Sequence, residues 1–233
     1  MKGNLYLLPN LLGDGNPDEM LPANVLKIIR GLRHFIVEDI RTSRRFLSKV
    51  GIGVPIDSLS FFTLNEHTTS NEILHYLDPL AEYDMGILSE AGVPGVADPG
   101  ADIVRMAHQK EVKVVPLVGP SSILMAVMAS GLNGQSFAFN GYLPVKRPER
   151  INKIKFFEKR AIQENQTQLF IEAPYRNNSL LEDLISSCLP TTMLGIACDI
   201  SLGTEFIQTK AAEVWKKKLP DLHKRPAIFM VGK

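Results

Sequence analysis

The sequence predicts a two-domain α/β protein: residues 1–141 form a parallel sheet with helices on both faces, and residues 142–233 form a mixed sheet with helices. Short apolar, β-prone runs alternate with helical patterns through the first half, which indicates parallel strands joined by crossover helices. These runs are hydrophobic almost without interruption, as expected for strands covered on both faces. The composition changes at Gly141–Arg147, so we place the domain boundary there.

The first domain is expected to contain five strand–helix pairs, each an apolar run followed by a stretch with helical periodicity. In chain order they are Asn4–Leu8 with Ala23–Leu32, Phe35–Glu38 with Thr42–Val50, Ser60–Leu64 with Asn71–Leu80, Gly86–Ser89 with Ala101–Lys110, and Val114–Val118 with Ser121–Leu132. This regular alternation is the main evidence for a parallel sheet.

The second domain has a less regular pattern. It opens with a charged helix from Glu149 to about Asn165, followed by a strand, a helix and three more strands. The later elements are expected at Gln168–Ile171, Ser179–Cys188, Met193–Asp199, Glu205–Thr209 and Ala227–Val231. Short connections between strands favour antiparallel pairing, so we expect a mixed sheet here.

The composition excludes several classes of protein. Hydrophobic residues make up 45% and charged residues 22% of the 233 residues, which excludes a disordered, collagen-like or disulfide-stapled chain. The two cysteines, Cys188 and Cys198, have no histidine at metal-ligand spacing, so no metal site is expected. A cytoplasmic location is expected, because the first apolar run is too short for a signal peptide. The uncharged stretch Val114–Val145 is interrupted by glycine and proline and is not expected to span a membrane.

The charge is unevenly distributed. Residues 1–145 carry 11 basic and 15 acidic side chains, whereas residues 146–233 carry 15 basic and 10 acidic ones. A basic cluster just past the domain boundary accounts for much of the excess, and Lys216–Lys218 lie in a second cluster. This asymmetry points either to a polyanionic partner or to solvated helix faces.

Two segments rich in glycine and proline, Ser89–Gly100 and Gly119–Ser122, directly follow predicted strands. In open parallel sheets, ligands bind beyond the carboxyl ends of the strands. Glycine lets backbone amides approach a ligand, and proline fixes the loop; tight connections are the alternative interpretation. The chain lacks a Gly-x-Gly-x-x-Gly sequence after the first strand and a Walker-type sequence, which disfavours dinucleotide and phosphate-binding nucleotide enzymes.

Ser89–Gly100 resembles the glycine/proline motif of the S-adenosylmethionine-dependent tetrapyrrole methylase superfamily, in its branch of ribosomal small-subunit RNA ribose 2′-O-methyltransferases. Further motifs in the family's order extend the resemblance over nearly the whole chain. They are Glu38–Thr42, Val118–Ser122, Gly141–Pro144, Ile171–Arg176 and Thr209–Lys210. The chain departs from the family pattern in its first loop, Pro9–Pro17, and at Gly203–Phe206.

The resemblance implies a two-domain tetrapyrrole-methylase-like fold, usually a homodimer, that binds S-adenosylmethionine in a cleft between the domains. It also implies which residues contact the cofactor, most of them through backbone groups or small side chains. These are Leu8, Pro9, Val93, Val96, Ser121 and Ser122 from the first part of the chain, and Glu172, Ala173, Ala197, Pro226 and Ala227 from the second.

No catalytic residue is certain from the sequence. The candidates are Asp39, Arg41, Glu90 and Asp98, where a carboxylate would orient a hydroxyl group and an arginine would hold a phosphate. The alternative for Asp39 is helix capping, and for Glu90 and Asp98 it is hydrogen bonding within their loop. Methyl transfer to oxygen depends largely on alignment, because the sulfonium donor is already activated.

The expected function is transfer of a methyl group from S-adenosylmethionine to a ribose 2′-hydroxyl of ribosomal RNA. The RNA contacts are expected in the basic cluster of the second domain, at Lys146, Arg147, Arg150 and Lys153. One alternative is a methyltransferase for a tetrapyrrole or another small molecule, which would not require these basic residues. Another is a non-catalytic relative that binds cofactor or RNA, and the divergent first loop keeps this possibility open.

Overall fold

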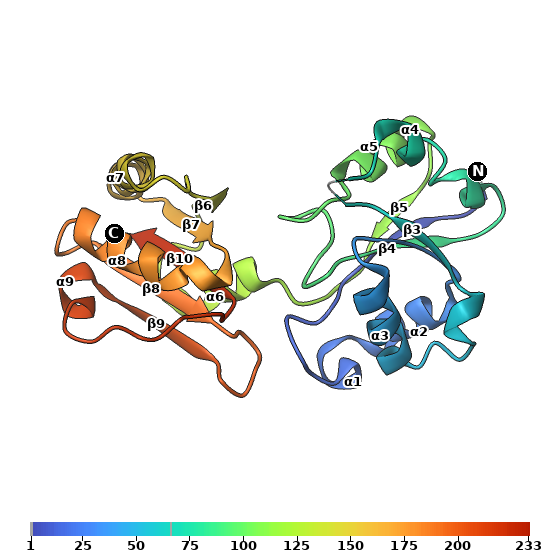
Figure 1. Cartoon of the computed structure of the whole chain (residues 1–233), viewed down its shortest axis with the longest axis horizontal. Helices are drawn as coiled ribbons and strands as arrows, with labels where there is room; N and C mark the ends of the chain where they lie inside the picture. Colours follow the sequence, from blue (N-terminus) through green and yellow to red (C-terminus); the bar gives the residue numbers. More distant parts are fainter. Residues whose placement is uncertain (1, 66) are drawn as a thin grey trace. The chain divides into compact units, whose positions relative to one another are not determined.

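The computed structural model describes residues 2–65 and 67–233, which form two compact units, one up to Ser121 and one from Ser122 onward (Figure 1). Each unit contains a five-stranded sheet. The division falls before the expected boundary after residue 141, because the helix Ser122–Ser130, expected as the last helix of the first domain, contacts strands of the second sheet. The strand Phe137–Tyr142 also belongs to that sheet, where it pairs with Thr167–Ile171. That strand was not expected from the sequence.

The first unit alternates strands and helices as expected, with strand order β3-β2-β4-β1-β5 and only parallel pairings. Its strands are β1 (Leu5–Leu8), β2 (His34–Val37), β3 (Ser60–Thr63), β4 (Met85–Leu88) and β5 (Val114–Pro116). Its helices are α1 (Pro17–Met20), α2 (Ala23–Gly31), α3 (Ile40–Val50), α4 (Ser70–Ile73) and α5 (Ala101–Gln109), with 3-10 turns η1 (Ile56–Ser58) and η2 (Asp78–Ala81). The predicted parallel sheet is therefore confirmed.

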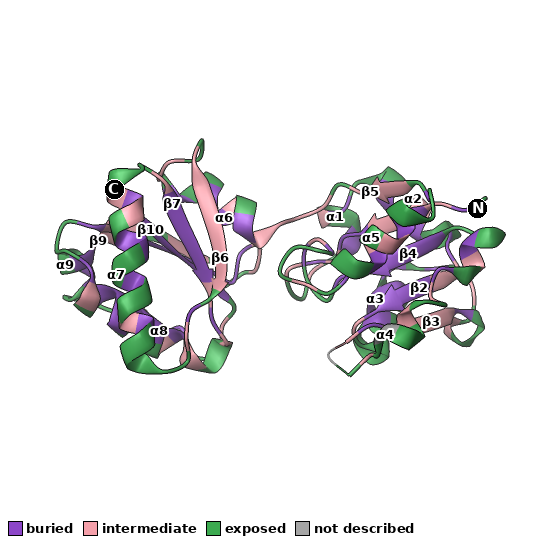
Figure 2. Cartoon of the chain, turned by 90° about the horizontal axis from the view of Figure 1, so that it is seen from above, coloured by how far each residue is buried: buried purple, intermediate pink, exposed green. Residues whose placement is uncertain are grey.

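Hydrophobic clusters cover both faces of the first sheet. Along β2, Phe35 and Val37 pack with the buried side chains of α2 and α3, whereas Ile36 packs with Ile103 and Ala107 of α5. This follows from the alternation of side chains along a strand. The strands β2 and β4 are buried between helices whose outer surfaces are exposed (Figure 2).

The prediction of a single helix over Asn71–Leu80 is wrong. The structure has the short helix α4, started by a capping box between Thr69 and Glu72, then turns, then η2. Pro79 lies within the expected helix, and proline in a helix interior removes a backbone donor and clashes with the preceding turn. Here it lies in the first turn of η2, where it is tolerated.

The second unit has the expected mixed sheet, with strand order β6-β7-β10-β8-β9, in which only β6 and β7 are parallel. Its strands are β6 (Phe137–Tyr142), β7 (Thr167–Ile171), β8 (Met193–Cys198), β9 (Phe206–Ala211) and β10 (Ala227–Gly232). Its helices are α6 (Ser122–Ser130), α7 (Arg147–Gln163), α8 (Asn177–Ser187) and α9 (Ala212–Trp215), with the turn η3 (Pro174–Arg176). Its main core lies between the sheet and α7, α8 and α9, and includes Trp215.

None of the helices in the described parts of the chain has the length and apolar character needed to cross a membrane.

Candidate functional site

The loops that follow β1 and β4 are joined at the carboxyl edge of the first sheet. The backbone of Asn10 exchanges two hydrogen bonds with Gly92, of 2.8 and 3.2 Å. The Asn10 side-chain amide also donates to the carbonyls of Ser89, at 2.9 Å, and Glu90, at 3.1 Å. Asn10 therefore fixes the divergent first loop against the glycine/proline loop, a role that sequence reasoning did not assign to it.

The loop after β5 approaches the same place. A Cβ atom on Gly119 would lie 2.1 Å from Cβ of Pro9, so only glycine fits this position. Since β1 lies between β4 and β5 in the sheet, all three loops meet at one edge. The predicted cofactor residues of the first unit are Leu8, at the end of β1, and Pro9, Val93, Val96 and Ser121 in the segments that follow these strands.

The glycine/proline loop is held in an unusual backbone conformation. Gly92, Gly95 and Gly100 all have positive φ angles, as does Ala97 at 58°. Within this loop, the Ser89 hydroxyl bonds to the carbonyl of Ala91 at 2.9 Å and to the carboxylate of Asp98. Several glycines are therefore required by the path of the backbone itself.

Burial raises the pKa of the Asp98 carboxyl above its ordinary value. The hydrogen bond from Ser89 acts in the opposite direction, and the nearby charge of Glu90 adds to the increase. Asp98 is partly buried, whereas Glu90 is exposed. The two predicted carboxylates of this loop thus differ in their surroundings.

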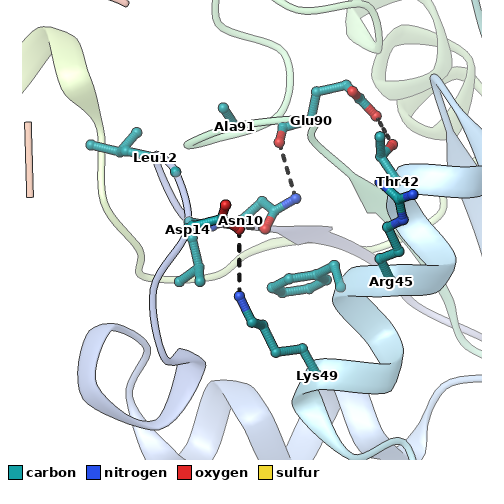
Figure 3. Close-up of a pocket in the computed structure, with 11 residues that line it drawn as sticks. Asn10, Leu12, Asp14, Thr42, Arg45, Lys49, Glu90 and Ala91 are labelled. Atoms are coloured by element: carbon teal, nitrogen blue, oxygen red, sulfur yellow. Dashed lines mark hydrogen bonds and ion pairs between the residues drawn. The ribbon is translucent and has the colours of Figure 1, made fainter. Parts of the chain in front are cut away.

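A pocket of about 510 Å³ lies beside these loops, between the loop after β1, helix α3 and the start of the glycine/proline loop (Figure 3). Its lining combines apolar, basic, acidic and neutral polar side chains. It is lined by Asn10, Leu11, Leu12, Gly13, Asp14, Thr42, Arg45, Phe46, Lys49, Glu90 and Ala91. The Thr42 hydroxyl donates to the Glu90 carboxylate at 2.5 Å and so links α3 to the loop.

Helix α3 carries one wall of this pocket, and its ends are well defined. Asp39 is the N-cap and accepts a hydrogen bond from the Thr42 backbone N–H at 2.8 Å; Gly51, with φ of 72°, ends the helix. Phe46 and Leu47 are buried in the core, which fixes the rotation of the helix. Arg45 and Lys49, spaced four residues apart, therefore face the pocket.

Asp39 and Arg41, two of the predicted catalytic candidates, do not line the pocket. The carboxylate of Asp39 is occupied as the cap of α3, and the backbone N–H of Thr42 lowers its pKa. Arg41 is exposed. Of the four candidates, only Glu90 lines the pocket, while Asp98 lies in the loop next to it.

The spacing of Arg45 and Lys49 on the predicted helix was the signal that would have revealed the basic wall.

The predicted cofactor residues of the second unit lie at one edge of its sheet. Glu172 and Ala173 follow β7, and Ala197 lies near the end of β8. Ala227 is the first residue of β10, and Pro226 directly precedes it. Because β10 is antiparallel to both neighbours, these positions meet at the same edge.

Glu172 has a buried carboxylate with its partners in place. It accepts hydrogen bonds from the Ala173 backbone N–H, at 2.7 Å, and from Nε of Arg176, at 3.0 Å. Arg176 is therefore paired with a carboxylate of its own unit.

The cofactor candidate Ser122 is the first residue of α6, also in this unit.

The predicted RNA contacts lie at the start of α7, and the structure corrects one of them. Arg150 is buried and donates two hydrogen bonds to the buried Asp183, of 2.6 and 2.8 Å, and one to the Val145 carbonyl. A guanidinium so enclosed is not available to a phosphate. Arg147 also bonds to Asp183, at 2.8 Å, but its side chain stays 67% exposed.

Lys146 and Lys153 are exposed on α7 or at its N-terminus. Lys146 lies 3.6 Å from the carboxylate of Glu149, and Lys153 lies over the rings of Phe156 and Phe157. Among residues 2–65 and 67–233, no group of three or more histidine, cysteine or acidic side chains is arranged to hold a metal ion.

The chain has the fold of a methyltransferase of known structure. The crystal structure of the methyltransferase CobJ aligns with a TM-score of 0.65, covering 99% of this chain and 94% of CobJ at 14% sequence identity. At this identity the likeness establishes the fold, which is that of the tetrapyrrole methylases. No family model matches the sequence.

The sequence is similar to several proteins that share one name. The chain is 30% identical over 206 residues to ribosomal RNA small subunit methyltransferase I of Vibrio cholerae, covering 88% of this chain and 65% of that protein. The proteins of the same name from Pseudomonas aeruginosa and Escherichia coli O157:H7 are 32% and 28% identical, over 78% and 89% of this chain and 60% and 67% of their own lengths. The chain thus spans about two thirds of these relatives or less. The chain is similar in sequence to this group of ribosomal RNA methyltransferases and shares the fold of the methyltransferase CobJ.

Proposed function

We propose that this protein transfers a methyl group from S-adenosylmethionine to a ribose 2′-hydroxyl of ribosomal RNA. The observation that carries the proposal is the similarity to proteins named ribosomal RNA small subunit methyltransferase I, which extends over 78% to 89% of this chain in the three relatives above. The meeting of three loops at the carboxyl edge of the first sheet supports it, since ligands of parallel sheets bind at that edge.

The residues at this edge fit the methyl donor. The loops offer backbone groups held in place by Asn10 and Gly119, together with the exposed apolar side chains of Val96 and Val118. Apolar surface of this kind suits the adenosine part of the donor, and a rigid loop reduces the cost of ordering the site. When bound, the donor supplies an electrophilic methyl group on a sulfonium.

A hydroxyl acceptor must lose its proton when its oxygen forms the new bond to carbon. Glu90 is our candidate to receive that proton, because its carboxylate lines the pocket and is held in position by the hydrogen bond from Thr42. Asp98, with its raised pKa, is the second candidate. We assign Asp39 to the structure of α3 and not to the chemistry.

The second unit contributes the remaining candidates. We propose Glu172, Ala173 and Ala197, with Ser122, Pro226 and Ala227, as further donor contacts, as the family resemblance implies. Lys146, Arg147 and Lys153 are proposed to bind phosphates of the RNA, because they are exposed and basic.

We also propose a homodimer. Helix α6 supports this, because its apolar side chains Leu124 and Met128 are 52% and 82% exposed and lie one turn apart. Light scattering at micromolar concentration should give twice the chain mass of 25.9 kDa. The mass of a single chain would exclude the dimer.

The test of function is incubation with methyl-labelled S-adenosylmethionine and separate fractions of ribosomal subunits lacking the modification, transfer RNA and small molecules. We expect the label in the RNA of the small subunit. Label in the small-molecule fraction alone would support the small-molecule alternative, and binding of the donor without transfer to any fraction would support a non-catalytic relative.

A further inference from the structure

The pocket in Figure 3 has a basic wall to which the proposed chemistry assigns no task. Arg45 and Lys49 lie one turn apart on α3 and both line the pocket. Between them, Phe46 is buried in the core of the unit. Core packing thus fixes the helix face on which the two cations lie, so their common direction does not depend on a flexible loop.

Both cations are available to a ligand. No hydrogen bond or ion pair joins the guanidinium of Arg45 to any other residue that the structure describes. Nζ of Lys49 lies 3.7 Å from a carboxylate oxygen of Asp14, whose side chain is fully exposed. Exposed pairs at such distances are weak. By contrast, the neighbouring Arg44 points to Asp57 and donates to it at 2.7 Å.

The loop side of the pocket, formed by residues after β1 and β4, has a different character. There Glu90 accepts the hydrogen bond of Thr42, and the amide of Asn10 is directed to loop carbonyls. The pocket therefore combines two cations on α3 with the Glu90 carboxylate of the glycine/proline loop, which Thr42 of the same helix holds. Its volume of about 510 Å³ is in the range of pockets that hold small organic ligands.

We propose that this pocket is a subsite for the RNA acceptor, in which Arg45 and Lys49 bind a backbone phosphate next to the nucleotide that is methylated. This inference rests on the proposed function. An arginine guanidinium can bind two phosphate oxygens at once, and a lysine adds a point charge. The pair thereby orients the acceptor, with its hydroxyl toward Glu90, and takes the role that the sequence had suggested for Arg41.

The test compares two double variants that each remove two positive charges. Arg45→Gln with Lys49→Gln changes the pocket, whereas Arg44→Gln with Arg105→Gln changes two exposed arginines outside it, paired with Asp57 and Asp102. Binding of a fluorescent single-stranded RNA is measured by anisotropy at several salt concentrations. Calorimetry with S-adenosylhomocysteine monitors the donor site, and steady-state methylation gives KM for RNA and kcat.

We expect the pocket variant to bind RNA about tenfold more weakly, because charged hydrogen bonds to a phosphate are lost. The slope of log affinity against log salt should become shallower by about 0.7, the value for one phosphate. KM for RNA should rise while the affinity for S-adenosylhomocysteine is retained. The control variant should change KM much less.

The outcomes separate this inference from the proposed function. Equal losses in the two double variants would mean a general effect of charge and would overturn the subsite. If the wild-type protein methylates RNA but the pocket variant keeps the same KM and salt slope, the subsite is overturned. The proposed function would then stand. A wild-type protein that neither binds nor methylates RNA would overturn both.

Discussion

Asp39 shows how a residue can match a family motif and still serve the local structure. Its carboxylate caps α3, and asparagine caps a helix about as well as aspartate. We therefore expect Asp39→Asn to keep the unfolding temperature and methyl transfer close to wild type, whereas Asp39→Ala lowers the unfolding temperature. Thermal unfolding and a methylation assay on both variants test this. Loss of methylation in a stable Asp39→Asn protein would instead make the carboxylate catalytic.

Asp98 should make stability depend on pH. Burial raises its pKa, so the folded state binds this proton more tightly than the unfolded state does. As the pH rises through the ordinary value of 3.8 and then the raised pKa, the carboxylate ionises where it is poorly solvated, and stability is lost. The unfolding temperature of Asp98→Asn minus that of wild type should therefore increase as the pH rises from acid to neutral. A difference that stays constant or shrinks with pH would contradict this.

At the scale of elements, the contact between the loops after β1 and β5 depends on Gly119. Gly119→Ala forces a Cβ atom against Pro9 and should cost about 1–3 kcal/mol of unfolding free energy, as overpacking does. Gly31→Ala adds the same atom at the end of α2, where nothing lies within 4 Å, and should be neutral or stabilising. Denaturation followed by circular dichroism compares the two. Equal effects would mean that the loops are not in close contact.

Breaking the ion pair between Arg150 of α7 and Asp183 of α8 should lower the free energy of unfolding. Arg150→Ala leaves the buried carboxylate of Asp183 with only the exposed Arg147, which should cost about 3 kcal/mol. Adding Asp183→Asn should recover part of that loss. Trp215 is the only tryptophan and is buried in this unit's core, so its fluorescence during urea denaturation reports on this unit. A fall in RNA affinity with unchanged stability would restore Arg150 as an RNA contact.

The sequence predicted most strands and helices because their signals are local. Apolar runs defined β1, β2 and β4, and Pro79 was a visible signal that the helix expected around it would break. The strand β6 was missed, since glycine at position 141 and its irregular pairing with β7 interrupt the pattern. The structure places this strand and α6 in the second unit.

The site was harder to predict because it depends on distant contacts. The partner of Arg150 lies 33 residues away in sequence, and the bonds of Asn10 reach residues 79 and 80 positions away. The charge of these residues alone could not show that Arg150 is buried and Arg45 is exposed. The glycine/proline loops were recognised, because their composition reflects the backbone angles that they adopt.

At the scale of the whole molecule, the chain has two units, each with a sheet and a core of its own. The excess of basic residues lies in the part from residue 146 onward, and the basic wall of the pocket lies in the first unit. We expect both units to contribute cations to RNA binding. The salt dependence of binding should then exceed what either set of residues provides alone.

The most direct measurement is the chemical position of the transferred methyl group. Small ribosomal subunits lacking the modification are incubated with the protein and methyl-labelled S-adenosylmethionine, and the extracted RNA is hydrolysed with alkali. Methylation of a ribose 2′-hydroxyl blocks cleavage of the adjoining phosphodiester, so we predict label in an alkali-resistant dinucleotide. Label in single nucleotides would mean methylation of a base, and absence of label from the RNA would contradict the proposed function.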